Sequence, residues 1–189
     1  MDPNIVFTYD RETEFVKKEH ICLNNFEHSP FVDQKGNHYF SAEHYYQCHK
    51  FDNFDDGEEF KKAFKDVLDC KDADTCKKLA RKLTKEDLKG KWQEKKWEEE
   101  LYKVTIMKRA LMLKYSQNLN MLKILLETGN KKVVERSERD SFWGGYLEGS
   151  KNVLGNLLME LRDNYNKTKL IFLEGSGFEP IKNIVINNR

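Results

Sequence analysis

Apolar residues recur at steps of three and four through most of the middle of the chain, which is the spacing of one face of an α-helix. In EEFKKAFKDVL, for example, Phe60, Phe64 and Val67 follow this spacing. Capping residues such as Ser41 and Asp72 stand where such segments begin, and Gly129 stands where one ends. The pattern predicts helices over residues 41–51, 58–68, 72–83, 97–115, 118–129 and 152–165.

The two ends of the chain have a different pattern. Residues 4–40 contain short aromatic or β-branched runs separated by the turn-forming segments EHSPF and DQKGN, which predicts a loop with short strand pieces. The segment KLIFLEGSGFEPIKNIVINN (169–188) predicts one or two strands with a turn. We therefore expect a mainly α, multihelical fold with a few short β-strands at the N- and C-terminal ends.

Residues that break helices and strands are few, with 3 Pro and 10 Gly in 189 residues. The sequence contains neither an internal repeat nor a Pro/Gly/Ser-rich linker. This indicates a single domain over residues 1–189. The 12 Phe, 8 Tyr and 3 Trp exceed what a disordered chain carries. The four cysteines are scattered without a CxxC pair and are expected to be free thiols.

The charge balance and the hydropathy of the chain argue against some classes of binding partner. The 33 Lys and Arg nearly balance the 32 Asp and Glu, so no overall field draws the protein to nucleic acid or to an anionic membrane. No apolar run approaches the roughly 20 residues that cross a bilayer, and the first residues lack the basic and apolar regions of a signal peptide. We expect a soluble cytoplasmic protein with no membrane partner and leave its oligomeric state open.

The predicted helix 41–51 places a carboxylate, an amide and an amine in one stripe. Glu43, Gln47 and Lys50 stand at i, i+4 and i+7, with Tyr46 beside them. A stripe of this kind is commonly a solvated charged face, and that interpretation stays open beside the catalytic one. His44 and His49 are five residues apart and diverge on a helix, so we expect no metal site, and the motifs indicate no cofactor.

A second group of candidate residues follows in the loop before the last predicted helix. Asp140, Trp143 and Gly144 can place a carboxylate and a stacking ring at one turn, where glycine lets a ligand approach the backbone. The alternative is a capping Asp and a core Trp. The segment from Gly149 to Asn152 precedes a helix and can hold an anion, as can Arg81, although many such positions bind nothing.

Several common signatures are absent from the sequence. It has no GxGxxG, Walker loop, GxSxG elbow or kinase signature, so dinucleotide redox, nucleotide hydrolysis and serine hydrolase chemistry lose their usual support. The residues alone therefore predict a helical domain with a carboxylate-containing site.

Seven segments taken in order resemble the NADAR or YbiA-like family, and they span residues 24–162. They are NNFEHSPF, FSAEHYYQCHKF, KKLARKL, IMKRALMLKYSQN, LLETG, ERSERDSFWGG and NVLGNLLMELR. The resemblance implies a mainly helical fold and an N-glycosidase that hydrolyses a ribosyl C–N bond. Family members act on phosphoribosylamino-pyrimidine intermediates of riboflavin biosynthesis, and others remove ADP-ribose from modified guanine.

The resemblance also implies roles for particular residues. The family's Glu, Lys and Asp fall on Glu43, Lys50 and Asp140, which we expect to be catalytic. Its upstream Trp falls on Trp97, with Trp92 as the competing candidate, and Ala80-Arg81 stands where the family usually has Gly-Arg. The expected substrate-binding residues are Asn24, Asn25, Phe26, Tyr46, Gln47, Arg81, Trp97, Trp143, Gly144, Gly149 and Asn152.

The candidate residues and the family resemblance together lead us to expect one of four functions. The first is removal of ADP-ribose from ADP-ribosylated guanine, as a nucleotide or in nucleic acid. The second is cleavage of the riboflavin-pathway intermediates. A module that binds ADP-ribose or a nucleotide without catalysis is a third, and a helical scaffold that uses Lys85 to Glu100 as a partner surface is a fourth.

Overall fold

The computed structural model describes residues 2–8, 18–51, 57–92 and 94–175. Most of this part of the chain is helical. Its helices are η1 (Lys18–Leu23, 3-10), α1 (Ala42–Cys48), α2 (Glu58–Leu68), α3 (Ala73–Lys82), η2 (Leu83–Asp87, π), α4 (Glu94–Glu98), α5 (Glu100–Gln117), α6 (Leu119–Glu127) and α7 (Val153–Gly175). Its strands are β1 (Ile5–Phe7), β2 (Phe31–Val32), β3 (His38–Tyr39) and β4 (Lys132–Val134).

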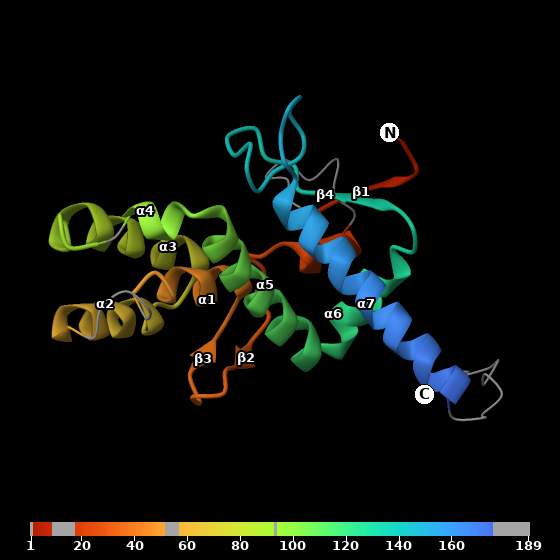
Figure 1. The fold of residues 1–189 in the computed structure, drawn as a ribbon, viewed down its shortest axis with the longest axis horizontal. Helices are drawn as coiled ribbons and strands as arrows, with labels where there is room; N and C mark the ends of the chain where they lie inside the picture. Colours follow the sequence, from red (N-terminus) through yellow and green to blue (C-terminus); the bar gives the residue numbers. More distant parts are fainter. Residues whose placement is uncertain (1, 9–17, 52–56, 93, 176–189) are drawn as a thin grey trace.

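Helix α5 runs through the middle of the molecule and separates two groups of elements (Figure 1). On one side α1 packs against α5, α3 and α2. On the other side α6 and α7 lie with the β1–β4 pair. The buried face of α5 supplies Ile106, Met107, Ala110 and Leu111 to one continuous apolar core. Because α1 lies at the centre of its group, its side chains are surrounded on several sides.

The short strands form two separate pairs. β1 runs parallel to β4 with Val6 opposite Val133, and β2 is antiparallel to β3 with Phe31 opposite Tyr39. The parallel pair joins residues far apart in the sequence and fixes the start of the loop that follows β4. α7 packs over β4, and the Asn152 side chain donates to Val133 O at 2.8 Å and accepts from Glu135 N at 3.1 Å.

The helical fold with a few short strands is confirmed, and several elements match their predicted ranges closely. The prediction was wrong for the C-terminal tail between 169 and 175, where α7 continues to Gly175. A short apolar run such as KLIFL suits either a strand or a helix, and no Pro interrupts it, so the established helix extends through it. Residues 176–188 of that prediction lie outside the described residues. Neither β4 nor the separate helix α4, which carries Trp97, was predicted.

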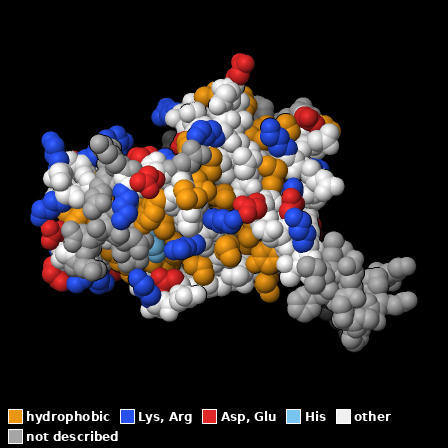
Figure 2. All heavy atoms as spheres, viewed as in Figure 1, with side chains coloured by type: hydrophobic (Ala, Val, Ile, Leu, Met, Phe, Trp, Pro, Cys, Tyr) orange, Lys and Arg blue, Asp and Glu red, His pale blue; other side chains and the backbone are white. Residues whose placement is uncertain are grey.

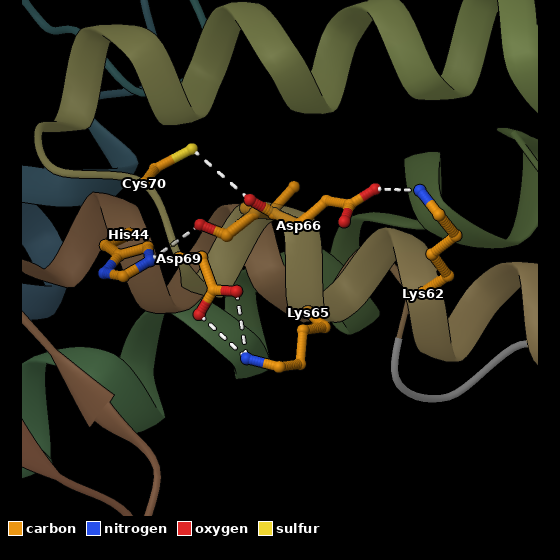
Figure 3. A network of polar contacts seen from close by, with 7 residues as sticks. His44, Lys62, Lys65, Asp66, Asp69 and Cys70 are labelled. Atoms are coloured by element: carbon orange, nitrogen blue, oxygen red, sulfur yellow. Dashed lines mark hydrogen bonds and ion pairs between the residues drawn. The ribbon is translucent and has the colours of Figure 1, made fainter.

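His44 joins α1 to the end of α2. Its Nε2 lies 3.0 Å from Val67 O, beside a set of contacts that includes the exposed ion pairs Lys62–Asp66 and Lys65–Asp69 (Figure 3). Burial lowers the pKa of His44, which favours the neutral ring. His44 therefore has a packing role. Among the described residues, no helix combines the length and apolar character needed to cross a lipid bilayer.

The N-caps of α1 and α3 provide a direct test of this arrangement. Ser41 Oγ accepts from His44 N at 3.1 Å, and Asp72 Oδ1 accepts from Thr75 N at 2.8 Å. Replacing either residue by Ala should lower the free energy of unfolding by about 1 kcal/mol, because one backbone donor loses its partner. Urea unfolding of the variants Ser41→Ala and Asp72→Ala measures this. An unchanged midpoint in both variants would show that the caps are not formed.

Candidate active site

Glu43 is a carboxylic acid buried in the first turn of α1, with 4% of its surface exposed. Its Oε1 accepts from Gln47 Nε2 at 2.7 Å, and its Oε2 accepts from Asn25 Nδ2 at 2.7 Å. The backbone N–H of Glu43 also donates to Asn25 O at 2.9 Å. The i, i+4 spacing seen in the sequence therefore produces a real contact, but the stripe faces the interior and is not a solvated surface.

Lys50 follows the end of α1 and is half-buried between aromatic rings. Its Nζ lies 5.9 Å from the ring centre of Tyr46 and 5.6 Å from that of Trp97, within the range of a cation–π contact. The Trp92 Nε1–H donates to Lys50 O at 3.1 Å. Both candidate tryptophans therefore contact Lys50: Trp97 flanks its amine, and Trp92 holds its backbone.

Burial moves the pKa values of Glu43 and Lys50 toward each other. Loss of water raises the pKa of Glu43, and the charges of Lys77 and Lys50 together with the two amide donors only partly oppose this. Loss of water likewise lowers the pKa of Lys50, with the charge of Glu43 acting in the opposite direction. The carboxylate is therefore a better base, and the amine a better nucleophile, than either group would be in water.

The turn at Asp140 has features of both interpretations that the sequence left open, a structural cap and a group placed at the site. Asp140 Oδ1 accepts from the backbone N–H of Phe142 at 3.0 Å and of Trp143 at 2.9 Å, which is a capping arrangement. Asp140 and Trp143 are nevertheless only half-buried. The Trp143 ring meets Tyr46 edge-on with centres 5.6 Å apart. The turn thus brings a carboxylate and an indole to the cluster around Glu43.

Two charged residues of the cluster were missed by the sequence analysis. Glu135, directly after β4, is 9% exposed, and burial, followed by the charges of Asp140 and Glu43, raises its pKa. The charge of Lys77, on α3, partly opposes the rise in the pKa of Glu43, and its Nζ lies 5.0 Å from the ring centre of Phe26. One feature of the sequence could have indicated that Glu135 is buried: it directly follows a pair of apolar β-branched residues, and a strand can bury such a position. Lys77 stood within a basic helical run without a distinguishing feature.

The loop that carries Asn25 is held by a buried lysine. Lys114 of α5 is 0% exposed, and its Nζ donates to Cys22 O at 2.7 Å and to Asn24 O at 2.8 Å. Asn24 Oδ1 accepts from Phe26 N at 2.9 Å, so the polar groups of Asn24 shape the loop. Burial lowers the pKa of Lys114 to about 8. This arrangement fixes the position of the Asn25 amide over Glu43.

The remaining predicted residues lie at different places. A Cβ at Gly144 would stand 2.5 Å from Asp140 O, so this glycine allows the turn to close on itself. Asn152 is buried with its amide bonded to the backbone around β4, Gly149 lies in an exposed turn with φ +76°, and Arg81 is exposed one helical turn beyond Lys77. Substrate contacts by these residues stay predictions.

A second surface feature lies apart from this cluster. Hydrophobic side chains gather over α5 and α7 (Figure 2), where an apolar groove is lined by residues including Leu111, Met112, Leu157 and Leu161. None of its described lining residues is acidic. Within the described ranges, no group of three or more His, Cys, Asp or Glu side chains is placed to share a metal ion.

Comparison with known proteins shows the family to which the chain and its fold belong. The profile of the NADAR domain matches residues 9–166. The solved NMR structure of YbiA from E. coli superposes with a TM-score of 0.68 at 25% identity, covering 97% of this chain and 94% of that chain. The protein belongs to the NADAR family and has the YbiA-like fold.

Curated relatives carry two kinds of name. N-glycosidase R617 of Acanthamoeba polyphaga mimivirus is 34% identical over 66% of this chain and 74% of the relative. N-glycosidase YbiA of Shigella flexneri is 32% identical over 75% of this chain and 79% of the relative. The chloroplastic riboflavin biosynthesis protein PYRR of Zea mays is 33% identical over 75% of this chain but only 23% of that longer protein.

The amide donors to Glu43 generate a testable consequence. In the variant Gln47→Met the pKa of Glu43 should rise further, because the charged form loses a hydrogen bond, and the free energy of unfolding should fall by about 1–3 kcal/mol. Carbon-13 NMR titration of the Glu43 carboxyl and urea unfolding measure the two effects. Gln117→Met is the matched control, since Gln117 bonds the backbone of Val32, which is not part of the cluster. A Glu43 titration that is equal in both variants would contradict the assigned contact.

Proposed function

We propose that this protein is an N-glycosidase that hydrolyses a ribosyl C–N bond, and that its substrate is ADP-ribosylated guanine. The observation that carries the proposal is the buried Glu43 carboxyl, held by two amide donors at 2.7 Å beside a desolvated amine. The N-glycosidase names of the relatives support the same class of reaction. Hydrolysis of this bond requires a base for water and stabilisation of positive charge on the ribose, and the cluster contains groups suited to both tasks.

Glu43 is the proton acceptor in this mechanism. As the C–N bond lengthens, positive charge develops at the anomeric carbon, and a carboxylate in a water-poor site stabilises that charge strongly. The same carboxylate takes the proton of the attacking water, for which its raised pKa is suitable. Asn25 and Gln47 keep the carboxylate in one orientation during the reaction.

Lys50 acts as the nucleophile in a covalent branch of the same reaction. When the ribose ring opens with the base still attached, its C1 becomes an imine carbon bonded to the base nitrogen. A neutral amine adds to this carbon and its proton passes to the base nitrogen, so the C–N bond breaks, the free base leaves and a Schiff base between Lys50 and C1 remains. Burial favours the neutral amine because it lowers the pKa of Lys50. Water then hydrolyses the imine and releases the sugar. Asp140, with one carboxylate oxygen used by the turn, offers the other to the ribose hydroxyls.

The preference for an ADP-ribosyl group rests on charge at the edge of the cluster. Lys77 and Arg81 stand one turn apart on the exposed side of α3, and Lys77 also lies against the Phe26 ring. Two cations with this spacing suit a diphosphate better than a single phosphate. The half-buried rings of Phe26 and Trp143 are of the kind that stacks on a base.

Phosphoribosylamino-pyrimidine intermediates of riboflavin biosynthesis are the second candidate substrates. Similar proteins of maize and of Vibrio vulnificus are named riboflavin biosynthesis proteins, which favours these substrates. This chain matches 23% of the length of the first and 30% of the length of the second. Parallel incubation of the purified protein with both substrates, analysed for free base and free sugar phosphate, separates the two. Binding of ADP-ribose without release of either product would indicate a binding module.

Loss of the Glu43 carboxylate should abolish turnover. The variant Glu43→Gln keeps the size of the side chain but cannot accept a proton, so kcat should fall by about 10²–10⁴-fold. Product release is followed by mass spectrometry, with circular dichroism to verify folding. The matched control is Glu59→Gln, an exposed acid on α2 paired with Lys91, which should keep full activity. Full turnover by a folded Glu43→Gln protein would remove Glu43 from the mechanism.

The covalent role of Lys50 is tested by trapping. Borohydride added during turnover should reduce the imine and leave the sugar attached to Lys50, with a mass increase located by peptide mapping. Lys50→Ala should give no adduct and should lose the part of the turnover that passes through the covalent branch, while Lys61→Ala on the exposed face of α2 should keep both. Full turnover by a folded Lys50→Ala protein, or the absence of an adduct on Lys50 in the unmodified protein, would exclude this branch.

A further inference from the structure

The proposed reaction leaves one proton unassigned. When the C–N bond breaks, both bonding electrons go to the nitrogen, which then needs a proton to leave as a neutral base. Glu43 is committed to accepting the proton of water, and the Asp140 Oδ1 atom accepts two backbone N–H groups. A separate group that carries a proton near neutral pH is therefore required.

We propose that Glu135 is the acid that protonates the departing nitrogen. This inference rests on the proposed function and adds a third acidic residue, with the opposite task from Glu43. Glu135 stands where β4 enters the loop of the Asp140 turn, so its backbone is part of the frame that carries Asp140 and Trp143. Its N–H donates to Asn152 Oδ1 at 3.1 Å, and its C=O accepts from Gly145 N at 2.9 Å.

The surroundings of the Glu135 carboxyl favour its protonated form. The side chain is 9% exposed, and its Oε2 is fully buried without a hydrogen-bond partner among the described residues. An ionised carboxylate in that position would leave a buried charge uncompensated, which is costly. The charged groups that act on it are Asp140, Glu43 on α1 and Lys77 on α3, and the two acids outweigh the single lysine.

The pKa of Glu135 agrees with this geometry. Burial, followed by the charges of Asp140 and Glu43, raises it to about 8. At neutral pH the group therefore carries a proton, and its pKa lies close to the pH at which it must release one. Two acidic residues whose environments assign them opposite tasks are the usual arrangement for acid and base catalysis.

The step balances as a hydrolysis. The O–H bond of Glu135 breaks and its proton joins the leaving nitrogen, while the C–N electron pair stays on that nitrogen. Water forms the new C–O bond at the anomeric carbon and gives its proton to Glu43. Solvent then carries a proton from Glu43 back to Glu135, which restores both groups. The sum is one water consumed and one N–H and one O–H formed.

The variant Glu135→Gln tests the role, because the amide preserves the shape but has no acidic proton. Its kcat should fall by about 10²–10⁴-fold with KM little changed, and the alkaline fall in kcat should lose the step near pH 8. Glu135→Asp, which keeps an acid, should retain part of the activity. Glu138→Gln, an exposed acid on the same loop, is the matched control and should behave as the unmodified protein does.

Stability against pH gives a readout that does not depend on turnover. The folded pKa is about 8 and the ordinary value is 4.5, so between these values the unfolded chain ionises while the folded protein keeps its proton. Glu135 thus destabilises the fold increasingly from about pH 4.5 to 8. Glu135→Gln should melt at a higher temperature than the unmodified protein at pH 9, with the difference shrinking toward pH 5.

The outcomes separate the two proposals. Hydrolysis by the unmodified protein and full hydrolysis by Glu135→Gln would overturn the role of Glu135 alone. No hydrolysis of either candidate substrate by the folded, unmodified protein would overturn the proposed function and this role with it. A constant melting difference across pH would show that Glu135 is not protonated in the folded protein, and would also overturn the role.

Discussion

The carboxyl of Glu43 is held inside the protein by the amides of Asn25 and Gln47, and the rest of the cluster depends on this contact. A carboxylate cannot be buried at small cost unless donors replace its water. Both amides are committed to that task, which leaves Asn25 Oδ1 and Gln47 Oε1 buried without a hydrogen-bond partner among the described residues. An acceptor without a partner costs about 1–3 kcal/mol. Stability is thus given up to hold the acid in one orientation, which is typical of functional sites.

Desolvation has different consequences for each charged group around Glu43. It raises the pKa of an acid and lowers that of an amine, so Glu43 and Lys50 become more reactive from the same cause. Glu135 experiences the same burial with two acids nearby, and its Oε2 has no hydrogen-bond partner among the described residues; its pKa rises to about 8. Hydrogen bonding therefore distinguishes the two buried acids: the amide donors oppose the rise in the pKa of Glu43, while Oε2 of Glu135 has no such donor among the described residues.

Supporting contacts far from Glu43 in the sequence hold this arrangement in place. Lys114 of α5 fixes the Asn25 loop, Trp92 fixes the Lys50 backbone, and Asn152 ties the start of α7 to β4 and to Glu135. Each of these residues uses its side chain to bond a backbone atom of another element. Because such bonds have defined geometry, the reactive side chains are attached to a rigid frame and not to independent loops.

The sequence determined the local elements and their faces. The three-and-four spacing predicted helix 58–68, and Ser41 marked the start of α1. The i, i+4 relation put Glu43 and Gln47 on one helix face, where the structure shows them in contact. These features depend on residues close together in the sequence, so they can be predicted from the sequence alone. The exposure of that stripe to solvent is not a local property, because it depends on α3, α5 and the Asn25 loop, which close over α1. Glu135 likewise reaches the cluster only through the pairing of β1 with β4, and Trp97 only through the separate helix α4. Tertiary structure therefore decided which charges lose their water, and with that which groups can react.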